Sequence, residues 1–323
     1  GKKMIERIVE DVRKKGSFSF EKIIENNNLS DDEFFEFLKF VYQDNIPEVR
    51  TSVDGKDFIV LEDENYYVEE KETIKAYLEN VKEKNEEIAG IEEKTVITDE
   101  NRTEMVEKYL KIAVRESLLY SKYGFSFLDM VQEATLGVIT ALNYYEKILL
   151  MTEEIEFFIK NFAVKYILEF QKDLLKDIKA SELSYILYLK VKVDKELGHT
   201  VDEISKRMNV TKEYIEKLEK LFDNVELDEM IESGQILEKA NKITQMYILE
   251  NIPKKLSYID ERILVMSYGL DDKIYSESEI AKSLNIAKHN VNILKEKALN
   301  KLSIDLLKNE FMKNSEETDY TVN

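Results

Sequence analysis

The chain has 323 residues, 43% hydrophobic and 35% charged, which is enough for two or three domains of ordinary size. Its net charge of −19 argues against nucleic-acid binding by the surface as a whole, because such affinity comes mainly from neutralised phosphates. With no Cys and only two His, the chain offers neither a disulfide, nor a thiolate metal site, nor a histidine-based catalytic centre. We therefore predict no metal, no cofactor and no catalytic residues.

The N-terminal run lacks an apolar signal core, and no window approaches 18 uninterrupted apolar residues. We therefore expect a cytoplasmic protein with no membrane contact. Residues 1–100 hold 15 Lys/Arg against 27 Asp/Glu, a balance of −12, whereas residues 273–302 hold six Lys against three Glu, a balance of +3. The chain has only 2 Pro and 9 Gly, so few residues would interrupt a helix. We therefore predict long helices with short connections, that is, an all-α fold.

Three short helices are predicted near the N-terminus. Apolar residues at helical spacing predict the first over 3–15, and Ser19 is the expected N-cap of the second. Ser30 and Glu33 form a capping-box pattern that opens the third. Alternating residues around Asp54-Gly55 then predict a β-hairpin, so the first 65 residues are expected to form a small, acidic, winged-helix-like domain.

The rest of the chain is predicted to be helical, with two separate helix-turn-helix patterns. A charged helix and linker precede residue 100, and an acidic, irregular stretch separates the two helix-turn-helix patterns. The predicted order is an N-terminal domain (1–65), a linker (66–100), a helical domain (101–180), a middle helix-turn-helix domain (181–222), an acidic linker (223–249), a C-terminal helix-turn-helix domain (250–311) and a tail (312–323).

The most informative run covers residues 127–145 and reads FLDMVQEATLGVITALNYY. Asp129, Gln132 and Glu133 lie at positions i, i+3 and i+4 and share one helical face, which on its own is also typical of an ordinary solvated face. Together with LKIAVRESLLYSKYG at 110–124, the run resembles the helix pair by which bacterial primary-type sigma factors dock on RNA polymerase. The resemblance implies that Asp129, Gln132, Glu133 and Leu136 bind core RNA polymerase.

Residues 151–170, MTEEIEFFIKNFAVKYILEF, stand where that family has the helix that opens the promoter. The family's paired tryptophans and the polar residues after them align with Phe157, Phe158, Lys160 and Asn161, so the resemblance implies that these four contact DNA. Aromatic rings stack on extruded bases in such sites. The alternative is that both phenylalanines belong to the core. Acidic residues also replace the family's basic and aromatic lead-in, at Glu153, Glu154 and Glu156.

The helix-turn-helix at 195–221 resembles the family's middle domain, and five Lys/Arg against five acids at 199–221 leave it neutral. The pattern at 256–302 resembles the C-terminal promoter-binding domain. There Ser276 and Glu279 form a capping box, and a second helix is predicted to start near Ala287. This helix is expected to present to DNA the residues Lys288, His289, Asn290, Asn292 and Lys295.

The C-terminal pattern also departs from the family, which has arginines where Asn290 and Asn292 stand. Asparagine is short and uncharged, and it is better suited to adenine than to guanine or phosphate. Either the preferred DNA sequence has changed or DNA binding is weaker. The alternative is a helix-turn-helix scaffold that serves protein contacts only.

The acidic N-terminal segment resembles the regulatory domain of primary sigma factors, which mimics nucleic acid in the polymerase's basic channel. Taken together, the resemblances predict a sigma-like, non-enzymatic initiation factor whose partners are core RNA polymerase and promoter DNA, with an anti-sigma factor as a further candidate. One alternative is a sigma-derived regulator that binds polymerase or another protein without reading promoters. A second is an enzyme on a helical scaffold, which no phosphate loop, paired histidines or nucleophile elbow supports.

Overall fold

The computed structural model describes residues 2–50, 68–88, 96–122, 125–176, 180–208, 210–225, 254–271 and 273–303, with a few positions between 234 and 243. In these ranges the chain forms helices joined by turns, and its only β-type pairings are isolated bridges at Phe18–Glu48 and Lys122–Lys254. The predicted all-α class is confirmed. The hairpin predicted around Asp54-Gly55 lies outside the described residues. None of the helices described has the length and apolar character needed to cross a membrane.

The N-terminal helices are α1 (Lys2–Lys15), α2 (Phe20–Asn26) and α3 (Asp31–Gln43). The predicted caps are confirmed: Ser19 caps α2, and the Ser30–Glu33 capping box opens α3 with both reciprocal hydrogen bonds, at 3.1 and 3.2 Å. Gly16 follows α1 with a φ of 72°, a left-handed conformation that glycine adopts without steric cost. The third helix buries an almost continuous aromatic and aliphatic face.

The central helices are α5 (Arg102–Leu119), α6 (Phe127–Leu142), the short α7 (Tyr145–Leu149) and α8 (Ile155–Lys176). Before them, α4 (Val68–Ile88) packs on α5, and its apolar residues recur at helical spacing at Ile74, Leu78 and Val81. Sequence reasoning assigned this segment to a charged helix and linker. The structure shows that its buried stripe belongs to the protein's core.

The C-terminal helices are α14 (Tyr258–Ser267), α15 (Glu277–Leu284) and α16 (Lys288–Leu302). The predicted capping box of Ser276 and Glu279 and the start of the second helix at Ala287 are both confirmed. Asn285 ends α15 in the left-handed conformation that a tight turn requires. The helices enclose a small core whose members are Ile263, Met266, Ile280, Ala281 and Val291.

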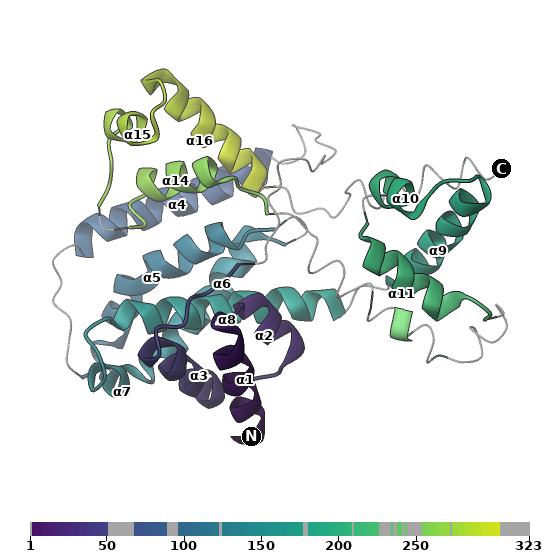
Figure 1. The fold of residues 1–323 in the computed structure, drawn as a ribbon. Coiled ribbons are helices and arrows are strands. Elements are labelled where there is room, and N and C mark those ends of the chain that lie inside the picture. The colour runs from purple at the N-terminus through teal and green to yellow at the C-terminus, as the bar shows by residue number, and fades with distance from the viewer. Residues whose placement is uncertain are drawn as a thin grey trace. The chain divides into compact units, whose positions relative to one another are not determined.

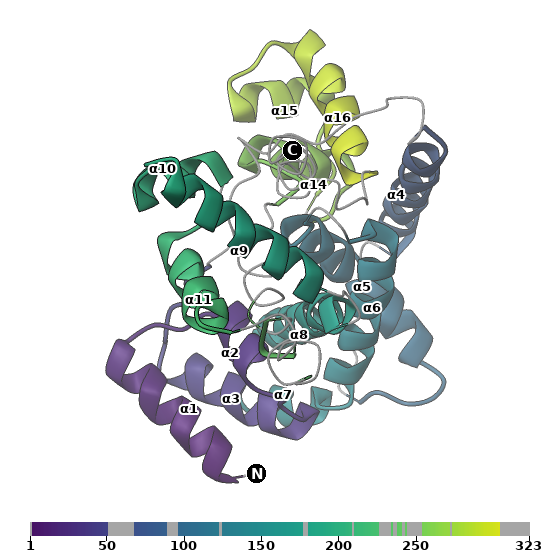
Figure 2. The same cartoon turned by 90° about the vertical axis from the view of Figure 1, so that its right-hand side faces the viewer.

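A larger core joins the C-terminal helices to the central ones. Its buried members include Leu78 of α4, Val114 of α5, Phe127 of α6 and Leu264 of α14. Salt bridges reinforce the contact between α4 and α16, because Glu296 pairs with Lys71 at 2.8 Å and with Lys75 at 3.2 Å. These hydrogen-bonded pairs lower the pKa of Glu296. Figure 1 and Figure 2 show α4 beside α16.

The helices α9 (Ala180–Glu196), α10 (Val201–Met208) and α11 (Lys212–Phe222) form a second compact unit with its own core. Thr211 caps α11 as predicted. The first unit holds α1–α7, α8 up to residue 171, and α14–α16. The exact domain boundaries expected from the sequence stay a prediction, although the first unit groups the C-terminal helices with the central ones.

Candidate functional site

The edge of α6 carries the four residues for which polymerase contact is predicted. The side of α6 facing the protein is apolar, with Met130, Ala134 and Val138 fully buried. On the opposite side Asp129 and Gln132 are exposed and Glu133 is partly exposed. Leu136, on the same side, is 49% exposed to solvent. Ser126 caps the helix by accepting a hydrogen bond from the Asp129 backbone amide at 3.3 Å. The predicted set therefore lies on one accessible face.

Gly137 explains how α6 is held behind this face. A Cβ atom at this position would lie 2.5 Å from the Phe162 carbonyl oxygen and 2.8 Å from the Ala163 Cα. Because both of these are backbone atoms of α8, they cannot move aside as a side-chain tip would. Glycine is therefore what allows the two helices to cross so closely, and the exposed edge is fixed on a rigid pair.

A groove runs beside the exposed edge, with a volume of about 600 Å³. Besides α6 residues, its lining includes Tyr77 of α4 and Leu110 of α5. Sequence reasoning missed both residues. The signal that pointed to Tyr77 was the apolar stripe of α4, on which this tyrosine follows Ile74 by three positions and precedes Val81 by four.

The residues of α8 for which DNA contact is predicted differ in accessibility. Phe158 is fully buried and Asn161 is 98% buried, whereas Phe157 and Lys160 are partly exposed. Aromatic residues of α3 provide the cover: the ring centroids of Phe35 and Phe158 are 5.8 Å apart. In this arrangement Phe158 and Asn161 are not accessible, so for Phe158 the alternative of a core position holds, while DNA contact by Phe157 and Lys160 stays a prediction. The physical reason is packing by a helix more than 100 residues away in sequence.

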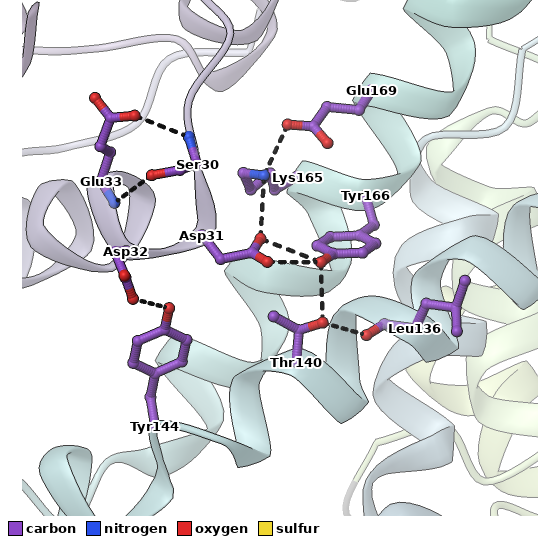
Figure 3. Close-up of polar contacts among 10 residues, drawn as sticks. All are labelled: Ser30, Asp31, Asp32, Glu33, Leu136, Thr140, Tyr144, Lys165, Tyr166 and Glu169. Carbon is purple, nitrogen blue, oxygen red and sulfur yellow. Dashed lines mark hydrogen bonds and ion pairs between the residues drawn. The ribbon is translucent and has the colours of Figure 1, made fainter. Parts of the chain in front are cut away.

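Polar contacts at the start of α3 complete this cover (Figure 3). The Asp31 carboxylate accepts hydrogen bonds from Lys165 Nζ at 3.3 Å and from the Tyr166 hydroxyl at 3.1 Å. The neighbouring Asp32 accepts one from the Tyr144 hydroxyl, and burial together with this carboxylate raises the pKa of Tyr144. Asp31 is thus bound by α8, the helix that the resemblance assigns to promoter opening, and Asp32 is bound by Tyr144, which immediately precedes α7.

The Tyr166 hydroxyl also connects this contact to α6. It lies 2.9 Å from the Thr140 hydroxyl, whose oxygen is in turn 2.9 Å from the Leu136 carbonyl oxygen (Figure 3). A continuous chain of polar contacts therefore leads from Asp31 on α3 to the backbone beneath the exposed edge of α6.

A buried carboxylate lies close to Lys160. Glu116 of α5 is fully buried, and within the described part of the chain neither of its oxygens accepts a hydrogen bond. Its Oε1 is 3.9 Å from Lys160 Nζ. Burial raises the pKa of Glu116, and the nearby cations Lys160, Arg115 and Arg50 oppose that shift.

Helix α16, for which DNA contact is predicted, presents part of its predicted set of contact residues. Lys288, His289 and Asn292 are exposed, and Asn290 is partly exposed. Lys295 is turned inward instead, with its Nζ 4.7 Å from the centroid of the Tyr268 ring. Burial lowers the pKa of Lys295, and two α4 lysines add to that effect. Lys295 is still partly exposed, so its DNA contact stays a prediction, although the cation–π contact draws its ammonium group toward Tyr268.

Known proteins resemble this chain at low identity, and no family model matches it. It is 25% identical over 225 residues to the RNA polymerase sigma factor SigA of Nostoc sp., covering 62% of this chain and 57% of that protein. It is 24% identical over 226 residues to the probable RNA polymerase sigma-C factor of Synechocystis sp., covering 62% and 55%. With SigA of Lactococcus lactis subsp. cremoris it shares 20% over 224 residues, covering 61% and 60%.

The chain spans less than two thirds of the length of these relatives. All three carry the same family name in different organisms, and each match covers more than 220 residues rather than a single motif. The helical fold and the exposed edge of α6 agree with the resemblance in the sequence. The chain is therefore similar to sigma factors over about three fifths of its length.

Proposed function

We propose that this protein binds core RNA polymerase through the exposed edge of α6 and directs it to promoters through its C-terminal helix-turn-helix. The observation that carries the proposal is the accessibility of Asp129, Gln132, Glu133 and Leu136 on one face of a helix fixed from behind by Gly137. Relatives named as RNA polymerase sigma factors support the assignment. In this role the chain positions the polymerase, which performs the chemistry, and a cytoplasmic location follows from that partner.

The proposal is tested by substituting two polar side chains of the edge. Gln132→Ala with Glu133→Ala is expected to abolish co-purification of core polymerase, because both side chains leave the interface while the buried face of α6 is unchanged. Circular dichroism checks that the helical content is retained. The matched control is Glu36→Ala with Gln43→Ala, an exposed Glu and Gln pair on α3. Undiminished co-purification of the first variant would contradict the docking assignment.

A second candidate function is a sigma-derived regulator that holds polymerase without opening promoters. The burial of Phe158 beneath α3 and the burial of Asn161 favour it, because strand opening requires side chains that reach an extruded base. The exposed acidic residues Glu153, Glu154 and Glu156 at the start of α8 add local repulsion toward phosphate. An anti-sigma partner, suggested by the family resemblance, remains a prediction.

The two functions are separated by run-off transcription with core polymerase on genomic DNA fragments. An initiation factor yields discrete promoter-directed transcripts that depend on this chain. The regulator yields polymerase binding in co-purification but no transcript above that of core polymerase alone. A promoter template whose strands are already separated then shows whether strand opening is the missing step. A regulator that still reads the distal promoter element supports transcription on this template but not on the double-stranded one.

A further inference from the structure

The exposed side of α16 differs in composition from the rest of this acidic chain. The helix lies in a fully described stretch, and its exposed side chains are basic, amide or aliphatic, namely Lys288, His289, Asn292, Ile293, Lys297 and Asn300. Its single carboxylate, Glu296, is partly buried and pairs with Lys71 and Lys75. Because the whole chain has 66 Asp/Glu against 47 Lys/Arg, a face without an exposed carboxylate is a local exception that does not repel phosphate.

Ile293 lies in the middle of this face and is its one apolar member, 51% exposed. His289 precedes it by four positions and Lys297 follows it by four, so the three residues share one side of the helix. Protein interfaces are built around a core of several apolar side chains. Within residues 276–303, all of which the structure describes, Ile293 is the only large apolar residue that is exposed. One aliphatic group among cations and amides fits a ligand with a single apolar group on a polar, anionic surface.

An A·T base pair has this combination of groups. In the major groove thymine presents its C5-methyl group and adenine presents the N7 acceptor and the N6 donor, whereas a G·C pair presents no methyl group. Asn292 is exposed next to Ile293, and an asparagine amide can donate to N7 and accept from N6. Successive residues of a helix point about 100° apart, so the two side chains can contact neighbouring groups without competing for one.

Both side chains are carried by a backbone that is fixed on either side of them. Before them, Val291 is buried in the small core of the C-terminal helices. After them, the Nζ of Lys295 lies 4.7 Å from the centroid of the Tyr268 ring. The exposed pair therefore approaches a ligand from a defined direction, which discrimination between base pairs requires.

We propose that α16 reads A·T base pairs in the major groove, with Ile293 against a thymine C5-methyl group and the Asn292 amide against adenine N6 and N7. This inference rests on the proposed function and deepens it by naming the base chemistry that the C-terminal helix-turn-helix recognises. Lys288 and Lys297, one helical turn to either side of the pair, then contact phosphates and carry no sequence information.

The test removes single groups from the DNA. Duplexes that bind the full-length chain together with core polymerase are selected from a randomised pool. Each thymine of a selected duplex is then replaced in turn by deoxyuridine, which lacks only the C5-methyl group. At one thymine the Kd is expected to rise about fourfold, the effect of losing one buried methyl group. Replacing each adenine in turn by 7-deazaadenine, which lacks the N7 acceptor, is expected to raise the Kd about threefold to tenfold at one position.

Two variants connect these effects to single side chains. Ile293→Ala is expected to bind the thymine and deoxyuridine duplexes equally at the responding position, while its response to 7-deazaadenine is retained. Asn292→Ala is expected to show the reverse. Because both side chains are exposed, neither substitution removes a core contact, and melting temperatures check this. The matched control is Val96→Ala, since this valine is 50% exposed in the first unit, and it is expected to respond like the unmodified chain.

The outcomes separate this inference from the proposed function. Loss of the methyl effect in Ile293→Ala alone supports the inference. A methyl effect of unchanged size in that variant overturns the role of Ile293, and so does weaker co-purification of polymerase by Ile293→Ala with an unchanged DNA response. Selected duplexes in which no thymine responds to deoxyuridine overturn the A·T reading and leave promoter direction standing. A pool in which no sequence is enriched overturns both.

Discussion

Helices α6 and α8 cross each other closely, yet their candidate contact residues have opposite accessibility. On α6 the predicted polymerase-contacting residues lie on an open face, while on α8 two of the four predicted DNA-contacting residues are buried, and one of them, Phe158, lies under α3. Both sets were assigned by resemblance to the same family. The difference teaches that a motif locates a helix face in the chain, whereas a distant segment decides whether that face is available.

The cover over α8 is built mainly from aromatic residues. Phe34 of α3 lies 5.2 Å from Phe162 of α8, and Phe35 of α3 lies 5.8 Å from Phe158 of α8, both measured between ring centroids. Such pairs contribute about 0.5–1.5 kcal/mol each beyond the area they bury. The α3–α8 contact therefore has the character of a core, and exposing α8 to DNA requires these pairs to separate.

The largest expected difference between α6 and α8 is in the stability effect of substituting Phe158. Phe158→Ala is expected to lower the free energy of unfolding by about 3–5 kcal/mol, because it removes a fully buried ring and leaves a cavity. Leu136→Ala on the open face of α6 is expected to change it by no more than about 0.5 kcal/mol. Urea denaturation of both variants measures the contrast. Similar small changes in the two would mean that α3 does not cover α8 in solution.

The close crossing of the two helices is tested at Gly137. Gly137→Ala is expected to destabilise the protein by about 1–3 kcal/mol, since its Cβ would overlap backbone atoms of α8. Gly234→Ala is the matched control, because a Cβ there meets no atom within 4 Å. Thermal unfolding of the two variants provides the measurement. Equal melting temperatures would show that α6 and α8 are further apart than described.

Helix α16, for which DNA contact is predicted, adds a third face, which is open but weakly charged. Asn290→Arg with Asn292→Arg is expected to tighten DNA binding by about tenfold at low salt and to steepen its salt dependence by up to about two phosphates. Asn300→Arg, an exposed position at the far end of α16, is the control for added charge. Fluorescence anisotropy at several salt concentrations measures both. A flat response would mean that this helix does not face DNA.

The smallest effect is expected from the buried carboxylate between α5 and α8. Burial raises the pKa of Glu116, so the folded state holds this proton more tightly than the unfolded chain does. The associated stability is present below the ordinary pKa of glutamate and is lost as the pH rises through the raised value. Glu116→Gln removes this titration.

Melting temperatures measured from pH 4 to pH 7 test the role of Glu116. The variant is expected to gain stability relative to the unmodified protein as the pH rises, while Glu153→Gln at an exposed position keeps the same pH profile as the unmodified protein. A Glu116→Gln profile parallel to that of the unmodified protein would show that the carboxylate is solvated or firmly paired.

Local features of the fold could be predicted from the sequence. Both predicted capping boxes and the faces of α6 depend on residues three or four positions apart, which a helix brings together by its own geometry. The sequence left the burial of Phe158 as one of two alternatives, and it did not predict the inward turn of Lys295 or the second wall of the groove. Each depends on a neighbour from a different helix, such as Phe35, Tyr268 or Tyr77, and helical periodicity carries no information on that pairing.

Helix α4 has a mechanical consequence for the first unit. Its 21 residues make a rod of about 30 Å, with Tyr77 on the groove and with Lys71 and Lys75 tied to Glu296 of α16. A rigid helix that is displaced on one side also displaces the elements bound to its other side. A molecule that binds in the groove and shifts α4 therefore also shifts the C-terminal helix-turn-helix.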